Sequence, residues 1–264
     1  MEKITKADLR QPDLFVESAG QSWVFVEKHF KVILSLFLLA VVASGIYIAK
    51  NFFDERSERH AMNDLFPVES EVLKLRDGFD RAKRNSIDKA ADQADQDPKK
   101  AELKKATGDL QADYGASLTN LESFANSHQD VVAGAEAALI ASGIYSDYQK
   151  ADKSVALLAP IAKKFSSGHS PLISGLLQMA LGTAQATQGD CKSAIASWQK
   201  VIENDRLKFL SGDAHIKSGV CSETLGDLNA AKDHYEKASS GEANVGKNAK
   251  TLLRALEVKK AQAG

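Results

Sequence analysis

The sequence is poor in aromatic residues, at 7%, and has only five prolines among 264 residues. It contains no run of alternating Val, Ile, Thr and aromatic residues bounded by turn signals, the pattern that predicts a β-strand. After residue 50, Ala, Lys, Asp, Glu, Ser and Leu predominate, and this composition favours helices over strands. We therefore predict an all-α protein.

An excess of charge of one sign is also absent, because the net charge is −1 and basic and acidic residues are interspersed. Without a continuous positive field for phosphates, we do not expect nucleic-acid binding. The two cysteines, Cys191 and Cys221, are too few for a disulfide framework and show no CxxC or HxxxH spacing that would indicate zinc. The sequence also lacks HExxH, GxSxG and GxxxxGK, so we predict neither an enzyme nor a cofactor.

One long apolar run is present, at residues 32–49, with no charge, Pro, Asn or Gln between Lys31 and Lys50. At about 1.5 Å per residue it makes a helix of roughly 27 Å, close to the hydrocarbon thickness of a bilayer. It predicts a single transmembrane helix. A cleaved signal peptide with its cleavage site at Val41 and Ala43 is the alternative, but the charged leader is long and apolar character continues beyond that site.

The leader, residues 1–31, predicts an interfacial helix with Trp23 and Phe30 at the level of the lipid headgroups, and an ordinary helix fits its spacing equally well. Five basic residues before the span oppose three just after it. This bias places the N-terminus in the cytoplasm and the large domain outside it. The opposite orientation, with a cytosolic domain, stays open as an alternative.

Residues 50–109 predict a polar, membrane-proximal helical region, with a flexible insertion at 82–105 where large apolar side chains are almost absent. Beyond Pro67, an apolar stripe at helical spacing needs a packing partner. The stripe consists of Val68, Val72, Leu75 and Phe79. Together with the small residues Ala40, Ser44 and Gly45 of the span, it suggests an alternative function as a homo-oligomeric, self-associating tether.

From residue 110 to the end, the sequence predicts Ala-rich helices, and two segments, 181–205 and 218–242, repeat at an offset of 37 residues. The matched residues are Gly182 with Gly219, Gly189 with Gly226, Ala194 with Ala231, and Trp198 with Tyr235. The pattern resembles the tetratricopeptide repeat (TPR), in which a Gly-Asp turn joins helix A to helix B. A third unit, 136–165, fits loosely, with Ser142 and Ser154 at the small positions and no Gly-Asp turn.

The TPR resemblance implies that residues 110–264 form an α-solenoid of antiparallel helix pairs. Gly182 and Gly219 would lie where helix A approaches helix B, and the aromatic residues would fill the space beneath the next repeat. Gly189 and Gly226 would end each helix A in the left-handed conformation. The sequence departs from the repeat pattern at four positions in helix A: Gln178, His215, Gln185 and Ser222.

The layout of leader, span and repeats is similar to the YfgM-like family of membrane-anchored TPR proteins, ancillary subunits of the SecYEG translocon. This resemblance implies a non-enzymatic scaffold in the bacterial inner membrane, with a periplasmic domain that contacts the translocon, secreted clients or chaperones. Specific motifs lie only within residues 178–242. The polar insertion is a departure from the family.

The repeat geometry implies a candidate groove on the concave face, able to accept an apolar peptide or an amphipathic helix. Its residues are Leu176, Met179, Thr183, Ile216, Val220 and Glu223. Alternatively, these residues pack against the C-terminal helix at 249–260. Cys191 and Cys221 would lie at the same end of the stack, either as a disulfide or as two buried thiols.

Overall fold

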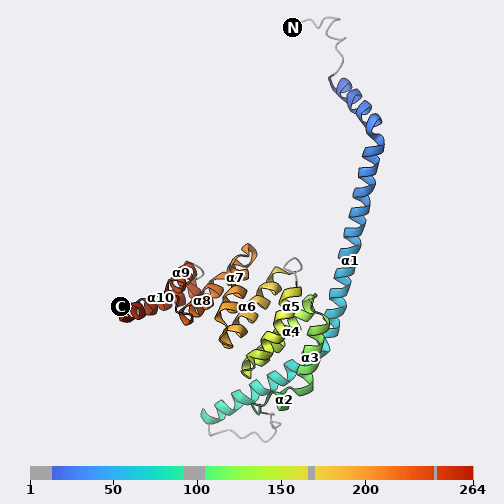
Figure 1. The fold of residues 1–264 in the computed structure, drawn as a ribbon. Helices are drawn as coiled ribbons and strands as arrows, with labels where there is room; N and C mark the ends of the chain where they lie inside the picture. The colour runs from blue at the N-terminus through green and yellow to red at the C-terminus, as the bar shows by residue number, and fades with distance from the viewer. Residues whose placement is uncertain (1–13, 92–104, 166–169, 241–242, 264) are drawn as a thin grey trace, which may run out of the picture. The chain divides into compact units, whose positions relative to one another are not determined.

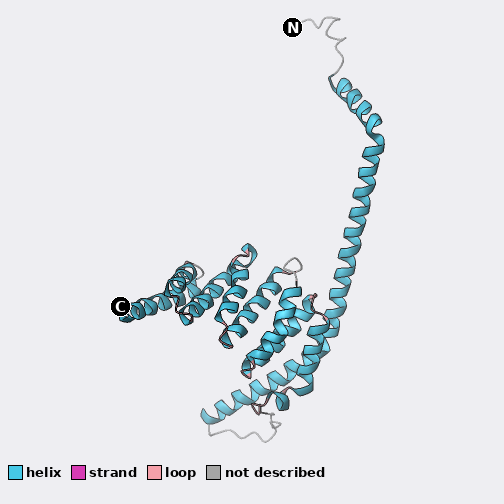
Figure 2. Cartoon of the chain, viewed as in Figure 1, coloured by secondary structure: helices cyan, strands magenta, loops and turns pink. Residues whose placement is uncertain are grey.

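The computed structural model describes residues 14–91, 105–165, 170–240 and 243–263. Nearly all of this part of the chain is helical and none of it is strand (Figure 2), so the predicted all-α class is confirmed. The chain divides into two compact units, Met1–Arg56 and Ser57–Gly264. The α-helices are α1 (Leu14–Ala91), α2 (Leu110–Asp113), α3 (Gly115–Ser127), α4 (Val132–Asp147), α5 (Ala151–Lys164), α6 (Pro171–Thr187), α7 (Cys191–Ile202), α8 (Lys208–Thr224), α9 (Leu228–Ser239) and α10 (Ala243–Ala263).

Helix α1 carries the apolar run near the N-terminus. The most apolar part of this run has no residue buried within the protein, which distinguishes it from a core helix. The described part of the chain therefore contains one helix that is long and apolar enough to cross a membrane. The interfacial placement of the Trp23 side chain, and residues 92–104 of the predicted flexible insertion, lie outside the described part of the chain.

In the second unit, the apolar stripe of α1 is part of the hydrophobic core. Val72 and Phe79 are buried in one core cluster with residues of α3 to α6, and Ala61 and Leu65 extend the same buried face toward the N-terminus. Helix α1 therefore continues through Pro67 instead of beginning there. Burial of Leu65 is worth roughly 1.5–3 kcal/mol, which offsets most of the penalty of about 3 kcal/mol for a proline inside a helix.

Polar contacts also tie α1 to the helices that follow. The backbone N–H of Val132 donates to both carboxylate oxygens of Glu58, at 2.9 and 3.1 Å, and so the first turn of α4 is capped from α1. The hydroxyl of Ser117 donates to Oε1 of Glu71 at 2.7 Å. The N-cap residue of α4, Val131, has no side chain able to accept this bond, so Glu58 replaces the usual local cap.

From α3 to α10, each helix packs chiefly on the next helix along the chain (Figure 1), and α3, α4, α6 and α8 also pack more weakly on the helix after that. The core follows this order as three successive clusters. The first joins α1 with α3 to α6, the second is centred on Trp198 between α6 and α8, and the third joins Tyr235 of α9 with Leu256 of α10. Contacts between neighbours along the chain therefore hold this unit together.

The matched positions of the sequence repeat lie at the closest helix contacts. A Cβ atom on Gly182 would lie 2.5 Å from Nε1 of Trp198, and a Cβ on Gly219 would overlap the ring of Tyr235. Ala194 and Ala231 are fully buried. Each aromatic ring therefore lies directly on a glycine, and a larger residue at either glycine would push the two helices apart.

The turns inside these two helix pairs are also alike. Gly189 and Gly226 have φ angles of +87° and +81°, the left-handed region that glycine adopts without strain. The aspartate that follows each glycine caps the next helix, because Asp190 accepts from the N–H of Ser193 at 3.1 Å and Asp227 from that of Ala230 at 2.9 Å. These caps fix where α7 and α9 begin.

The pair α4–α5 has the same internal spacing, although its sequence lacks the Gly-Asp turn. The hydroxyls of Ser142 and Ser154 lie 3.3 Å apart where the two helices meet, and Leu158 is buried at the position that Trp198 holds in the next pair. Gln149 occupies the turn with a φ angle of +57°. A glutamine therefore adopts the left-handed conformation that glycine supplies in the other two turns.

The 37-residue offset extends beyond the segments that the sequence comparison matched. Gly175 and Gly212 are related by it, and a Cβ atom would lie 2.7 Å from Leu207 at the first position and 2.8 Å from Val245 at the second. Ala249 follows at the same offset and is fully buried. The spacing of small residues therefore continues into α10, which packs on α9 and α8.

We predict that Gly182→Ala and Gly219→Ala each lower the free energy of unfolding by roughly 1–3 kcal/mol, because the added methyl group overlaps an aromatic ring. Gly78→Ala in α1 is the control, because its Cβ atom meets nothing within 4 Å, and it should be neutral or raise stability by up to about 1 kcal/mol. Urea unfolding of the full chain in detergent, followed by far-ultraviolet circular dichroism, measures all three. Equal stability of the three variants would contradict the close helix contacts.

We also predict that Gln149→Gly raises the free energy of unfolding by about 1 kcal/mol, because it removes the strain of a left-handed non-glycine residue. Gln188→Gly is the matched control, since Gln188 stands at the end of α6 with a φ angle of −76° and gains nothing from glycine. It should lower stability by about 0.5–1 kcal/mol. The same unfolding measurement applies, and a loss in both variants would mean that the turn at 149 is unstrained.

Candidate functional site

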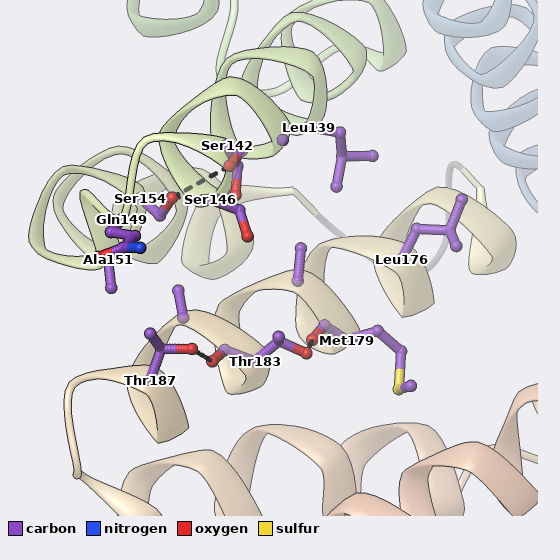
Figure 3. Close-up of a pocket in the computed structure, with 13 residues that line it drawn as sticks. Leu139, Ser142, Ser146, Gln149, Ala151, Ser154, Leu176, Met179, Thr183 and Thr187 are labelled. Carbon is purple, nitrogen blue, oxygen red and sulfur yellow. Dashed lines mark hydrogen bonds between the residues drawn. The ribbon is translucent and has the colours of Figure 1, made fainter. Parts of the chain in front are cut away.

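A pocket of about 480 Å³ lies between α4, α5 and α6 (Figure 3). Large apolar side chains line part of it, and small residues leave the space open. The large ones are Leu139, Leu176 and Met179, and the small ones are Gly143, Ala151, Ala180 and Ala184. None of the described residues that line the pocket is charged. A neutral, mainly apolar cavity of this size is typical of sites that take up apolar groups.

Four hydroxyl groups around the pocket, those of Ser142, Ser154, Thr183 and Thr187, form hydrogen bonds within the protein. The Oγ1 atom of Thr183 donates to the carbonyl of Met179 at 2.8 Å, and that of Thr187 donates to the carbonyl of Thr183 at 2.9 Å (Figure 3). Ser142 bonds to Ser154 across the α4–α5 contact. Because these donors already have acceptors, an apolar partner that covers them would not leave them unsatisfied.

The structure brings together one half of the predicted groove. Leu176, Met179 and Thr183 line the pocket, whereas Ile216, Val220 and Glu223 lie on α8 outside it. Glu223 accepts a hydrogen bond from the Tyr235 hydroxyl at 2.6 Å and another from Lys259 of α10 at 3.4 Å. Polar contacts with α9 and α10 therefore occupy this end of α8.

The other wall of the pocket belongs to α4, which is not part of the groove predicted from the sequence. Leu139, Ser142, Gly143 and Ser146 all line it. A signal for them was present, because Ser142 already stood at a small position of the loosely fitting unit at 136–165. Extending the groove by one unit toward the N-terminus would have identified them.

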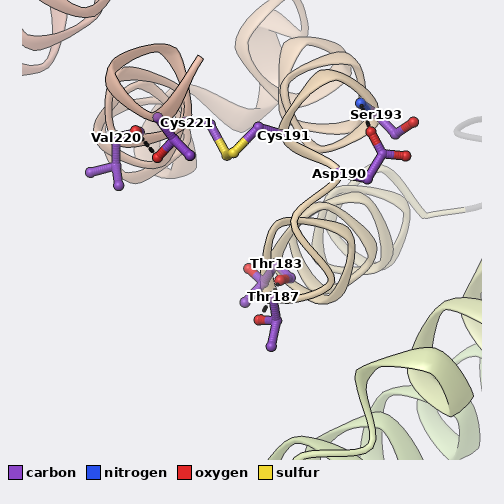
Figure 4. Close-up of a disulfide and its surroundings, with 8 residues drawn as sticks. Thr183, Thr187, Asp190, Cys191, Ser193, Val220 and Cys221 are labelled. Carbon is purple, nitrogen blue, oxygen red and sulfur yellow. Dashed lines mark hydrogen bonds between the residues drawn. A yellow bond between two sulfur atoms is a disulfide. The ribbon is translucent and has the colours of Figure 1, made fainter. Parts of the chain in front are cut away.

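Cys191 and Cys221 form a disulfide whose Cα atoms are 5.1 Å apart (Figure 4). Cys191 is the first residue of α7, directly after the capping residue Asp190, and Cys221 lies in the last turn of α8. Both are buried, with 5% and 3% of their surface exposed. A bridge across 30 residues stabilises a fold by roughly 3–4 kcal/mol on the chain-entropy estimate.

One carboxyl group, that of Asp113, is buried away from the pocket, with 3% of its surface exposed. Burial alone would raise its pKa, but hydrogen bonds from Thr107, Tyr148 and Gly108 outweigh this effect and lower the pKa. The Tyr148 hydroxyl donates to it at 2.7 Å, and burial together with this bond raises the pKa of Tyr148. Because Thr107, Gly108 and Tyr148 all donate hydrogen bonds to its carboxylate, Asp113 fixes the turn before α2 and has a structural role.

Among the residues that the structure describes, no group of three or more His, Cys, Asp or Glu side chains is arranged to hold a metal ion. Comparison of the chain with protein-family models, with curated proteins and with solved structures finds no match. The TPR and YfgM-like resemblances therefore stay predictions from the sequence.

Proposed function

We propose that this chain is a membrane-anchored, TPR-like scaffold that binds other proteins at the bacterial inner membrane. Residues 32–49 would span the membrane, the leader would be cytoplasmic, and the helical unit would face the periplasm, in contact with the Sec translocon, secreted clients or chaperones. The observation that carries the proposal is the uncharged pocket between α4 and α6. It supplies a binding surface without the clustered acids, bases or nucleophiles of a catalytic site.

The shared geometry of three helix pairs supports the TPR-like part of the proposal. The pairs α4–α5, α6–α7 and α8–α9 each have a small residue at the helix contact, a left-handed residue in the turn, and a large buried residue in the second helix. In a solenoid, the first helices of successive pairs lie side by side along one face. The pocket lies between two such helices, α4 and α6.

The chemistry of the pocket indicates what it would bind. A charged side chain that entered would lose its hydration and find no opposite charge among the lining residues. The chain's own segment 92–104 contains seven charged residues and a single large apolar one, Leu103, so it is a poor occupant. We infer that the ligand is the apolar face of a helix or extended segment from another protein.

The disulfide supports the proposed orientation, because disulfides persist in oxidising compartments such as the periplasm and are rare in the cytosol. The alternative of a self-associating tether has less support, since two residues of its proposed stripe, Val72 and Phe79, are buried inside the unit. A self-associating tether would need a different surface for contact between copies of the chain.

The orientation can be tested with a membrane-impermeant maleimide on intact spheroplasts. Because both native cysteines are bonded and buried, an exposed cysteine is introduced on α7 by Ala196→Cys. We expect this variant to be labelled without permeabilisation, while the wild type is not labelled without reductant. A second variant in the leader, Ser18→Cys, should be labelled only after permeabilisation. The reverse pattern would place the domain in the cytosol and overturn the periplasmic assignment.

Binding at the pocket can be tested by placing a photo-crosslinking phenylalanine derivative at Thr187, an exposed lining residue. We expect crosslinks to secretion or envelope-assembly proteins in intact membranes. Gly143→Leu should reduce them about tenfold, because Gly143 lines the pocket and a side chain there begins in open space. Gly78→Leu makes the same change in open space on α1 and should have no effect. Crosslinks that Gly143→Leu leaves unchanged, or that contain no envelope protein, would contradict the proposal.

A further inference from the structure

Two histidines face each other where α8 packs on α9. The Nδ1 atoms of His215 and His234 are 3.0 Å apart. Their ring centroids are 5.3 Å apart. With the two Nδ1 atoms 3.0 Å apart, the centroids are this far apart only when each Nδ1 points almost directly at the other. One Nδ1 must therefore be protonated and donate a hydrogen bond to the other Nδ1, which is unprotonated.

This geometry fits a hydrogen bond and not a metal chelate. A metal ion binds imidazole nitrogen at about 2.0–2.1 Å, so an ion on the line between two nitrogens would need them about 4 Å apart. The observed distance is 3.0 Å. No third ligand is grouped with the pair in the described part of the chain. The pair therefore links the two helices through one N–H···N hydrogen bond.

The contact between α8 and α9 has unusually polar surroundings. Ser218, one turn after His215, is fully buried, and its hydroxyl has no hydrogen-bond partner among the described residues. At the 37-residue offset, the matching residue of α6 is Leu181, an apolar side chain packed in the first core cluster. The histidine pair is one of several contacts between α8 and α9, beside the ring of Tyr235 on Gly219 and the Tyr235–Glu223 hydrogen bond.

Protonation of the pair is unfavourable while the helices are packed. Burial lowers the pKa of His215 to about 4, with further lowering by His234 and Lys237 against an opposing effect of Asp233. Burial likewise lowers the pKa of His234, where Asp233 opposes it and Lys237 adds to it. Asp233 accepts a hydrogen bond from Lys237 at 2.7 Å, so these two charges largely offset each other. No other charged group of the described residues contributes to either shift.

These directions set the pH at which the contact weakens. A histidine released into water takes up a proton near its ordinary pKa of 6.5, whereas in the packed pair burial lowers the pKa of His215 to about 4 and also lowers the pKa of His234. The packed state is therefore fully favoured above pH 6.5 and loses stability as the pH falls from 6.5 toward 4. The first added proton still leaves one Nδ1 donor facing one acceptor. The second leaves two charged donors facing each other, and the hydrogen bond is lost.

We propose that His215 and His234 form an acid-sensitive clasp, which holds α9 and α10 on α8 at neutral pH and releases them when both imidazoles are protonated. The clasp does not depend on what the pocket binds, because the pocket lies between α4, α5 and α6. Its release would detach the C-terminal end of the helical unit and leave α4 to α7 folded.

The test is amide hydrogen exchange on the full chain in detergent at pH 7 and pH 5, corrected for intrinsic exchange rates. We expect protection in α9 to fall about tenfold more than protection in α4, because the released histidines bind protons that the packed pair does not. His215→Gln combined with His234→Gln removes the titration and should abolish this difference. Glutamine already stands at the matching position of α6, Gln178.

Two control variants separate the clasp from other titrating groups. His128→Gln changes a histidine that is stacked on Phe124 away from the pair, and Glu223→Gln removes the carboxylate that Tyr235 and Lys259 contact. Both should keep the wild-type difference. The proposal is overturned if protection in α9 is independent of pH, if α4 loses protection equally, or if the double variant responds like the wild type.

If the double variant does not fold at pH 7, imidazole titration by NMR on the wild-type chain decides instead. We expect coupled titrations for His215 and His234 below the ordinary value of 6.5. Two independent titrations near 6.5 would overturn the clasp.

Discussion

The close contact between the two helices of each pair is the constraint on which the rest of the helical unit depends. Trp198 lies on Gly182 and Tyr235 on Gly219, with no room for even a methyl group between them. In α4–α5, the hydroxyls of Ser142 and Ser154 meet at the corresponding contact. Because each pair closes over a small residue at the same place, successive pairs have similar shapes and can stack in order along the chain.

The pocket follows from this stacking. When pairs pack side by side, their first helices become neighbours, and the space between α4 and α6 is filled only as far as their side chains reach. Gly143 and Ala180 are too small to fill it, so a cavity is left between larger apolar residues. At the contact between α8 and α9, a hydrogen bond joins His215 and His234. Stacking of the helix pairs therefore accounts for the cavity between α4 and α6, whereas the histidine pair is specific to α8 and α9.

The sequence predicted those features of the helix pairs that only certain residue types can form. A close contact admits only small residues and a left-handed turn favours glycine, so Gly182, Gly189 and their partners at the 37-residue offset were recognisable. Gln149 was not, because a glutamine gives no sign of a left-handed backbone. The all-α class was predictable from composition. The continuation of α1 through Pro67 was not, since it depends on tertiary burial of Leu65.

The groove could be predicted from the sequence only in part. Helical periodicity indicates which face of α6 is available, and Leu176 and Met179 do line the pocket. It does not indicate which helix lies across from that face, and the wall proved to be α4 and not α8.

The disulfide and the proposed clasp have a physical relation that follows from their positions. Cys221 is in the last turn of α8 and is bonded to the first residue of α7, so the end of α8 stays attached to α7 whether or not α9 is packed against it. Opening that begins at His215 and His234 can therefore proceed toward the C-terminus through α9 and α10, while the covalent bond opposes its spread toward the pocket. A periplasmic location would supply both conditions that this arrangement needs, an oxidising environment for the bridge and exposure to external pH for the histidines. In a reducing cytosol the bridge would open, and acid release would no longer be confined to the C-terminal helices.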